Sequence, residues 1–282
     1  MKPGNCCTLI YTSGTTGPPK AVMLSHDNIT WTVDNIMEGY KNLNKSERIL
    51  SYLPLSHIAA QMIDIYLMMK IGGVTYFYDE NIIKSSFVLS IKEVKPTLFF
   101  AVPRVWEKLY EKIKQIDDDR KGVKKVLFNF AKQIGNECTK NQQFGNSKSK
   151  PFGYWVANTF VFNNIKKKLG FQDTKLFVTG SAPIAKEVLE YLSSIDIPVF
   201  EVFGLSETAG PLSISSAEAW KIGFCGRPMK GVECKRDKET GELLIKGRNV
   251  FMGYLYNVEG TADSFDENGY FKTGDAVIFG ML

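Results

Sequence analysis

The sequence has few of the residues from which metal centres and disulfide scaffolds are built. It contains only two histidines, His26 and His57, so we expect no histidine-rich metal site. Its five cysteines include no C-x-x-C pair, and their odd number favours reduced thiols in a cytosolic setting. No apolar run is long enough to span a membrane and no signal peptide is evident, so we expect a soluble or peripheral protein.

Charge of either sign is also modest in this chain. The net charge is +5 over 282 residues, and lysines gather most densely at 121–125 and 166–168. A solvated helix face explains both clusters, so we expect no nucleic acid partner. Weak attraction to anionic membrane surfaces stays open, and the oligomeric state is not fixed by the sequence.

The order of apolar and polar residues indicates a layered α/β fold. Helical and strand-like patterns alternate up to residue 205, and residues 26–28 offer N-caps to the helix that follows them. After Gly210 the pattern changes to short strands and turns. We therefore expect an α/β portion over residues 1–210 and a β-rich portion over residues 211–282.

A polar, glycine-rich loop follows the first apolar run of the chain. The run 6–10 predicts a short buried strand, which the glycines and the Pro-Pro pair cannot continue. Backbone N–H groups, hydroxyls and one cation suit a phosphate group. The loop consists of Tyr11, Thr12, Ser13, Gly14, Thr15, Thr16, Gly17, Pro18, Pro19 and Lys20.

This loop is not a Walker-type phosphate loop. Lys20 stands three residues after Gly17 and is followed by Ala21, whereas that motif needs lysine directly after glycine and then Ser or Thr. A flexible surface loop is the simpler reading of such a cluster taken alone.

Two later loops follow the expected strands 176–179 and 199–203. Ligands bind at the carboxyl ends of strands in open α/β sheets, where small residues would admit a flat base and Phe203 would stack on it. Glu207 offers a hard oxygen ligand for Mg²⁺, although Phe203 as core and Glu207 as a solvated acid are the simpler alternatives. The candidate residues around the nucleotide are Gly180, Ser181, Ala182, Pro183, Glu201, Val202, Phe203, Gly204, Leu205 and Ser206.

Two further patterns bear on these loops. Ser206 is not a hydrolase nucleophile, because Thr208 occupies the glycine position of the nucleophile elbow and both histidines precede the serine. Near the end of the chain, Thr273-Gly274-Asp275 places one carboxylate at a turn, where its two oxygens could bind both ribose hydroxyls. Taken alone, Thr-Gly-Asp is a common turn.

Taken together, these loops occur in the order and rough spacing of the adenylate-forming superfamily, and the chain most resembles long-chain acyl-CoA synthetases of the bubblegum type. The resemblance implies the large N-terminal domain of such enzymes, with a distorted barrel as its β-rich portion. The stretches that carry it, beyond the loops above, are 6–11, 23–31, 51–61 and 102–108.

The resemblance implies a two-step reaction. A long-chain fatty acid attacks the α-phosphate of Mg²⁺-bound ATP and releases diphosphate, and the thiol of coenzyme A then attacks the acyl-adenylate. Thr12 to Lys20 would grip the β- and γ-phosphates, Ser206 the α-phosphate, Glu207 the Mg²⁺ and Asp275 the ribose. Thr16, His57 and Glu207 would act in catalysis, and His57, Gln61 and Trp106 would lie near the acyl substrate, unless His57 merely ends a helix and Trp106 is core.

The chain departs from the family pattern in three respects. Ala21 replaces a glycine, which would strain the loop if the residue had a positive φ. Phe203 replaces a tyrosine and so lacks the hydroxyl. The chain ends at Leu282, before the family's ribose-binding arginine and the C-terminal domain with its adenylation lysine, and it begins within the family's N-terminal domain.

These departures keep three functions open. The chain is a fragment of a long-chain fatty acid–CoA ligase, a catalytically inactive remnant that binds nucleotide or acyl groups, or an adenylating enzyme for a non-fatty acid. By the resemblance we expect it in the cytoplasm, with the periphery of the endoplasmic reticulum membrane as a further location.

Overall fold

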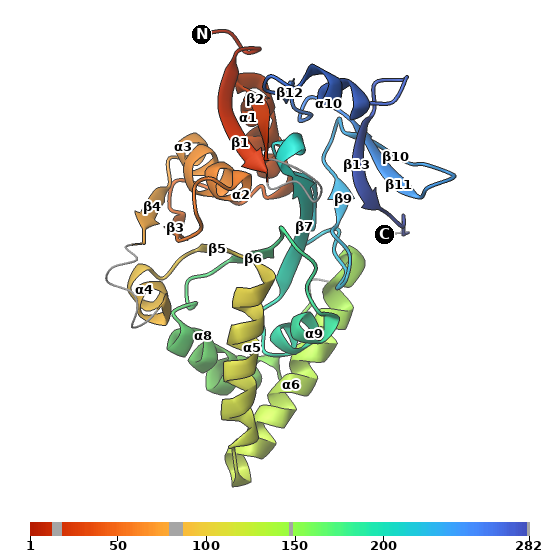
Figure 1. The fold of residues 1–282 in the computed structure, drawn as a ribbon. Coiled ribbons are helices and arrows are strands. Elements are labelled where there is room, and N and C mark those ends of the chain that lie inside the picture. The colour runs from red at the N-terminus through yellow and green to blue at the C-terminus, as the bar shows by residue number, and fades with distance from the viewer. Residues whose placement is uncertain (13–18, 79–86, 147–148, 281–282) are drawn as a thin grey trace.

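The computed structural model describes residues 1–12, 19–78, 87–146 and 149–280 of the chain (Figure 1). Its centre is a sheet in the strand order β5-β6-β7-β8-β9, in which β5, β6 and β7 run parallel and β8 and β9 antiparallel. The strands are β5 (Leu98–Ala101), β6 (Leu176–Thr179), β7 (Val199–Leu205), β8 (Gly210–Ile214) and β9 (Arg227–Pro228).

A parallel pair of strands continues this sheet beyond β5. The pair is β3 (Arg48–Ser51) and β4 (Val74–Phe77). The backbone N–H of Thr97 donates to the carbonyl of Arg48 at 2.9 Å, which joins β3 to the start of β5. The parallel pairs β3–β4, β5–β6 and β6–β7, with helices between the strands, confirm the predicted α/β fold.

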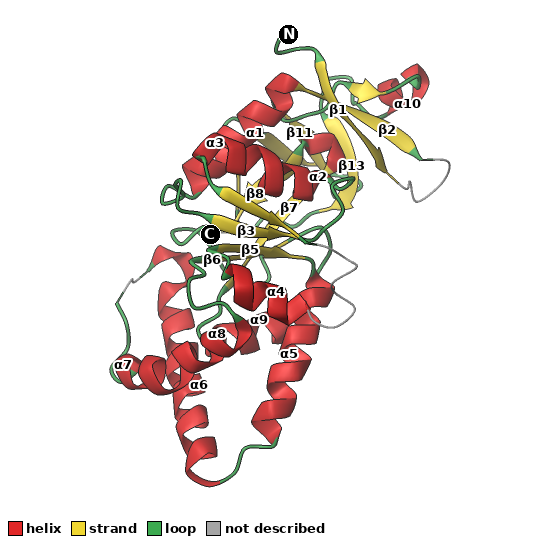
Figure 2. Cartoon of the chain, turned by 90° about the vertical axis from the view of Figure 1, so that its left-hand side faces the viewer, coloured by secondary structure: helices red, strands yellow, loops and turns green. Residues whose placement is uncertain are grey.

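Helices cover both faces of the sheet, as Figure 2 shows. On one face lie α1 (His26–Gly39), α2 (Ile58–Ala60), the π-helix η1 (Gln61–Leu67) and α3 (Met68–Ile71). On the other lie α4 (Phe87–Val94), α5 (Pro103–Asp118), α6 (Gly122–Gln142), α7 (Tyr154–Ala157), the π-helix η4 (Asn158–Phe162), α8 (Asn163–Leu169) and α9 (Lys186–Ser194), with the short 3₁₀ helix η3 (Gln143–Gly145) after α6. Within the described residues, no helix combines the length and the apolar character needed to cross a membrane.

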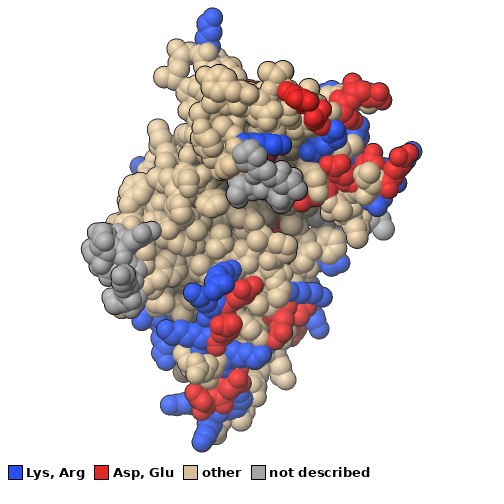
Figure 3. Space-filling model, viewed as in Figure 1, with Lys and Arg blue, Asp and Glu red and all other residues tan. Residues whose placement is uncertain are grey.

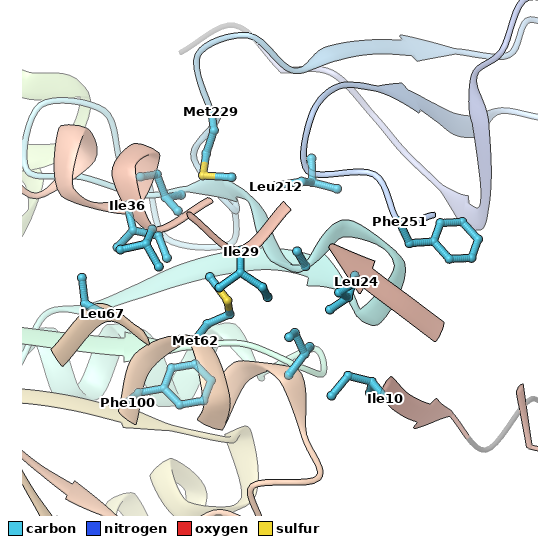
Figure 4. Packing of buried hydrophobic residues seen from close by; sticks show 14 of the residues in the cluster. Ile10, Leu24, Ile29, Ile36, Met62, Leu67, Phe100, Leu212, Met229 and Phe251 are labelled. Atoms are coloured by element: carbon cyan, nitrogen blue, oxygen red, sulfur yellow. The ribbon is translucent and has the colours of Figure 1, made fainter. Parts of the chain in front are cut away.

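Each face of the sheet has its own hydrophobic core. Phe100 packs in the core under α1 and η1 with Ile29 and Met62 (Figure 4), whereas its neighbour Phe99 packs with Trp106 on the opposite side. Successive side chains of a strand point to opposite faces, so β5 serves both cores. Burial of each large apolar side chain contributes about 1.5–3 kcal/mol, which makes these two cores the main source of stability.

The β-rich portion consists of two small antiparallel sheets. One joins β1 (Cys6–Thr12), β2 (Lys20–Ser25) and β12 (Gly253–Tyr254), and the other joins β10 (Glu233–Arg236), β11 (Glu242–Lys246) and β13 (Phe271–Ala276). The helices α10 (Val258–Asp263) and η5 (Ser206–Thr208) complete this part. Residues 211–282 supply β10 to β13 to these sheets, but β1 and β2 come from residues 6–25, and β9 belongs to the central sheet. Both small sheets are open and the described strands form no closed barrel, so a distorted barrel was the wrong expectation for these residues.

Two local predictions are corrected near the N-terminus. The run 6–10 forms part of strand β1, but Ile10 is its only buried member, because one face of the hairpin is open to solvent. Helix α1 is capped by Ser25 rather than by residues 26–28: the Ser25 hydroxyl accepts from Asn28 N–H at 3.0 Å, and the Asn28 side-chain oxygen accepts from Ser25 N–H at 2.8 Å. This reciprocal pair satisfies two backbone donors at the start of the helix.

Candidate nucleotide and acyl site

An apolar cavity of about 270 Å³ extends along β5 and β6 and reaches the carboxyl ends of β6 and β7. Its walls come from α1, from the α2–η1 segment and from the sheet, including Ile36, Ile63 and Val178. Its polar lining comes from His57 and from the strand-end residues Ser181 and Ser206. These three polar residues are among the site residues that the sequence predicts.

Two glycines let the backbone approach closely at this end of the sheet. A Cβ atom on Gly180 would lie 2.8 Å from Cγ2 of Val202, and one on Gly204 would lie 1.9 Å from the carbonyl oxygen of Gly210. Ser181 next to Gly180 has φ 73°, a left-handed conformation that non-glycine residues adopt only at a cost of about 1–3 kcal/mol. Such strain is typical of residues held for binding.

The three residues Lys20, Tyr254 and Glu207 form a second polar group beside the hairpin of β1 and β2. Nζ of Lys20 lies 4.8 Å from the centre of the Tyr254 ring, and the Tyr254 hydroxyl donates to Oε1 of Glu207 at 2.9 Å. Burial, followed by the charge of Glu207, raises the pKa of Tyr254, so its hydroxyl keeps the proton that it donates. One cation and one carboxylate are thus fixed at the start of β2 and the end of β7.

Sequence reasoning missed Tyr254. No local pattern distinguishes it from the other tyrosine two residues later, and its position depends on the pairing of β12 with β2. The backbone N–H of Phe251 also donates to the carbonyl of Glu207 at 2.8 Å, so the segment 251–254 supports the carboxylate from two directions.

The predicted phosphate loop closes the β1–β2 hairpin. Thr12 pairs with Lys20 across the two strands, and the Thr12 hydroxyl donates to the Lys20 carbonyl at 3.4 Å. The predicted loop residues Ser13, Gly14, Thr15, Thr16 and Gly17 lie outside the described residues. Ala21 lies inside strand β2 and is absent from the positive-φ residues, so its replacement of glycine causes no strain.

The three predicted acyl-site residues occupy different environments. His57 precedes α2, lines the cavity and makes no side-chain cap to the helix. Gln61 does not line the cavity, because its amide donates to the Leu55 carbonyl at 2.7 Å and accepts from Thr8 at 3.3 Å. Trp106 is fully buried and donates to the Ala101 carbonyl at 3.1 Å, which fits the alternative that it is a core residue.

The remaining strand-end candidates are placed around the cavity. Val202 and Gly204 line the cavity, whereas Phe203 is half-buried against the first core and is not part of the lining. Ala182 and Pro183 are exposed beside Ser181, and Leu205 joins Ser206 in the lining. The lining thus brings Val202, Gly204, Leu205 and Ser206 together, whereas Ala182, Pro183 and Phe203 lie outside it.

Two predicted acids lie away from the cavity. Oε2 of Glu201 accepts from Gly223 N–H at 2.7 Å, and burial raises the Glu201 pKa to about 7. Asp275 lies on the exposed side of β13, where burial and then the charge of Glu242 raise its pKa. Glu201 therefore anchors the loop around residue 223, and neither acid touches the cavity lining.

A comparison with known families gives a match to the AMP-binding enzyme family over residues 1–255. The chain belongs to the AMP-binding enzyme family. The match covers β1 to β12 and so includes the hairpin, the cavity and Glu207.

Curated relatives narrow the likeness within the family. The chain is 46% identical to the long-chain-fatty-acid–CoA ligase ACSBG2 of Xenopus laevis over 98% of its length, covering 38% of that protein. It is 42% identical to ACSBG2 of Homo sapiens over 98% of the chain and 42% of that protein. It is 36% identical to ACSBG1 of Homo sapiens over 98% of the chain and 39% of that protein. The predicted bubblegum-type resemblance is confirmed, and the chain spans about two fifths of the length of these relatives.

Solved structures confirm the fold. A malonyl-CoA ligase with methylmalonyl-CoA and AMP bound superimposes with a TM-score of 0.68 at 21% identity, over 97% of this chain and 50% of that one. The o-succinylbenzoate coenzyme A synthetase of Bacillus subtilis in complex with AMP superimposes with a TM-score of 0.68 at 22% identity, over 98% of this chain and 47% of that one. At these identities the likeness establishes the adenylate-forming fold alone.

Proposed function

We propose that the chain forms the ATP- and acyl-binding part of a long-chain fatty acid–CoA ligase. Such an enzyme converts fatty acid, ATP and coenzyme A into acyl-CoA, AMP and diphosphate through an acyl-adenylate. The observation that carries the proposal is the apolar cavity whose polar end contains His57, Ser181 and Ser206. An alkyl chain in its apolar part would leave the carboxylate among these polar groups.

The polar groups suit the phosphates of ATP. Lys20 and the loop that it follows would hold the β- and γ-phosphates, and Ser206 the α-phosphate. Glu207 fits a Mg²⁺ ion, because Mg²⁺ takes one or two carboxylates and completes its shell with phosphates and water. The ion would neutralise charge on the phosphates during transfer, while Tyr254 holds the Glu207 carboxylate in place.

The lining favours an alkyl substrate over an aryl one. Aliphatic side chains of α1, η1 and the sheet provide most of the wall, with Tyr40 and Phe100 as its aromatic members. Coenzyme A would arrive after the adenylate has formed.

A ligand-binding experiment tests this function. We expect a non-hydrolysable palmitoyl-adenylate analogue to raise the melting temperature of the 282-residue chain more than an acetyl analogue does, since ligand at 100 times its dissociation constant stabilises a protein by about 2.7 kcal/mol. Ile63→Trp, which fills the cavity, should remove the palmitoyl effect while AMP still binds. Ile116→Trp, at an exposed position of α5, is the matched control.

Other outcomes would identify the alternatives. A benzoyl analogue that stabilises the chain more than the palmitoyl analogue would indicate an adenylating enzyme for aryl acids. Binding of the palmitoyl analogue without release of diphosphate from ATP and palmitate would indicate that this chain binds its ligands without turnover. Equal effects of all analogues on the wild type and on Ile63→Trp would contradict the acyl role of the cavity.

A further inference from the structure

Six large apolar side chains are exposed on the helical layer, far from the cavity. Phe152 is 101% and Trp155 72% exposed, and Val123, Val126, Phe130 and Phe160 are exposed by 38% to 82%. We call these six residues the aromatic patch. Scattered apolar residues are common on protein surfaces, but a contiguous group of this kind marks an interaction site.

The members of the patch lie on neighbouring helices. Val123, Val126 and Phe130 follow one another at helical spacing along α6. A Cβ atom on Gly153 would lie 3.0 Å from the Phe130 ring, so this ring touches the backbone between Phe152 and Trp155. Figure 2 shows α7 beside α6 at this level. Phe160 lies in the π-helix η4, which continues α7 directly after Ala157.

Positive charge surrounds the patch. Segments 121–136 and 149–170 contain no Asp or Glu, and their lysines are Lys121, Lys124, Lys125, Lys132, Lys150, Lys166, Lys167 and Lys168. Figure 3 shows the opposite side of this helical half, over α5, where Lys and Arg side chains are interspersed with Asp and Glu.

Only part of this charge is neutralised within the protein. Asp117 contacts Lys125 and Lys132, and Asp196 contacts Lys150 and Lys166. The four remaining lysines form no ion pair with an acid among the described residues; they are Lys121, Lys124, Lys167 and Lys168. The other acids near the patch are Asp118 and Asp119, before Lys121, and Glu137, two turns after Phe130.

We propose that the aromatic patch docks on an anionic phospholipid surface. Exposed aromatic rings would enter the boundary between headgroups and acyl chains, and the four lysines would lie against negative headgroups. A second copy of the chain would bring the same positive charge against the patch, and like charges oppose such a contact. This surface is independent of the function proposed for the cavity.

Vesicle sedimentation of the full 282-residue chain tests the proposal. We expect binding to phosphatidylcholine vesicles that contain phosphatidylserine, and markedly weaker binding to vesicles of phosphatidylcholine alone and at high salt. Tryptophan fluorescence should shift to shorter wavelength on binding. Of the four tryptophans, Trp106 and Trp220 are buried, so Trp155 is the most exposed reporter, and Trp155→Phe should remove most of the shift while binding persists.

Paired variants separate the apolar and charged contributions. Phe152→Ser with Trp155→Ser should reduce partitioning about tenfold or more, because it removes both side chains that enter the boundary. Lys167→Gln with Lys168→Gln should reduce it about fivefold per lysine. Tyr256→Ser with Val258→Ser, and Lys238→Gln with Lys272→Gln, alter equally exposed residues elsewhere and should bind as the wild type does.

Three results would overturn the proposal. The first is that the wild type fails to bind anionic vesicles. The second is that the Phe152→Ser, Trp155→Ser variant binds them as well as the wild type does. The third is that the wild type self-associates in solution and binds no vesicles, and that this variant does not self-associate. The last result would assign the patch to a second copy of the chain. A thermal unfolding transition that matches the wild type shows that each variant is folded.

Discussion

Glu201 shows how far a residue's role depends on what surrounds its side chain. The sequence places it in the strand that leads to the nucleotide loop, whereas the structure directs its carboxylate to the backbone of residues 223 and 224. Burial is the largest cause of its raised pKa, and the N–H groups that it accepts from lower the pKa only in part.

The pH dependence of stability should report this residue. Burial raises the folded-state pKa of Glu201 to about 7, above the 4.5 of a free glutamate side chain, so the folded state binds its proton more tightly than the unfolded state does. Stability is therefore present at low pH and is lost as pH rises from about 4.5 to about 7, by on the order of 2–3 kcal/mol. Urea unfolding at a series of pH values measures this loss, and Glu201→Gln should remove it.

The matched control is Glu259→Gln, at an exposed position of α10, which should keep the wild-type pH profile. If Glu201→Gln also keeps that profile, the raised pKa of Glu201 is wrong.

Ala21 shows what a motif comparison can and cannot say. Its identity departs from the family pattern, but whether this matters depends on a backbone angle that the pattern does not contain. Inside β2 an alanine is compatible with the extended backbone and is buried against the core. We expect Ala21→Gly to lower the free energy of unfolding by about 0.5–1 kcal/mol in urea denaturation, through the entropy of the unfolded chain. An increase in stability would contradict this account.

At the scale of elements, the start of α1 depends on one serine. Ser25 and Asn28 exchange hydrogen bonds that satisfy two backbone N–H groups at the helix start. Ser25→Ala should lower the free energy of unfolding by about 1 kcal/mol, the usual cost of losing an N-cap. Chemical denaturation measures the loss. Ser46→Ala, at an exposed position outside any helix, should cost much less, and equal costs for both would contradict the capping role.

Helices and parallel strands were the elements that the sequence predicted best. The alternation before residue 205 identifies β3 to β7 and the helices between them, because each has a local apolar pattern. The pattern over 58–71 predicts a helix, but the π-helical turn η1 within it depends on contacts that Asp64 and Thr75 make across the fold. Local periodicity cannot predict such contacts, because they join residues of different elements.

At the scale of the whole molecule, the pairing of distant segments could not be predicted from the sequence. β12 pairs with β2 although some 230 residues separate them, and Asn28 donates to the carbonyls of Arg248 and Val250 at 2.7 and 3.0 Å. The change of pattern at Gly210 was visible, but not the return of the later strands to the first hairpin. Tyr254 was missed for that reason.

Asn28→Ala tests this long-range connection. Two carbonyls would lose their donor and the Ser25 N–H its acceptor, so we expect a loss of about 1–3 kcal/mol. Amide hydrogen exchange should speed up in 248–255 and leave β5 and β6 unchanged. Asn44→Ala, in an exposed turn, serves as control. Exchange that speeds up everywhere would show a global effect in place of a local one.

The pairing of β2 with β12 also bears on how the protein is made. Chains emerge from the ribosome with the N-terminus first, and folding units form as they become complete. The β1–β2 hairpin precedes β12 by some 230 residues, so its third strand and the tyrosine that holds Glu207 are synthesised well after the hairpin itself. The hairpin therefore leaves the ribosome before the strand and the side chain that complete its surroundings in the folded protein.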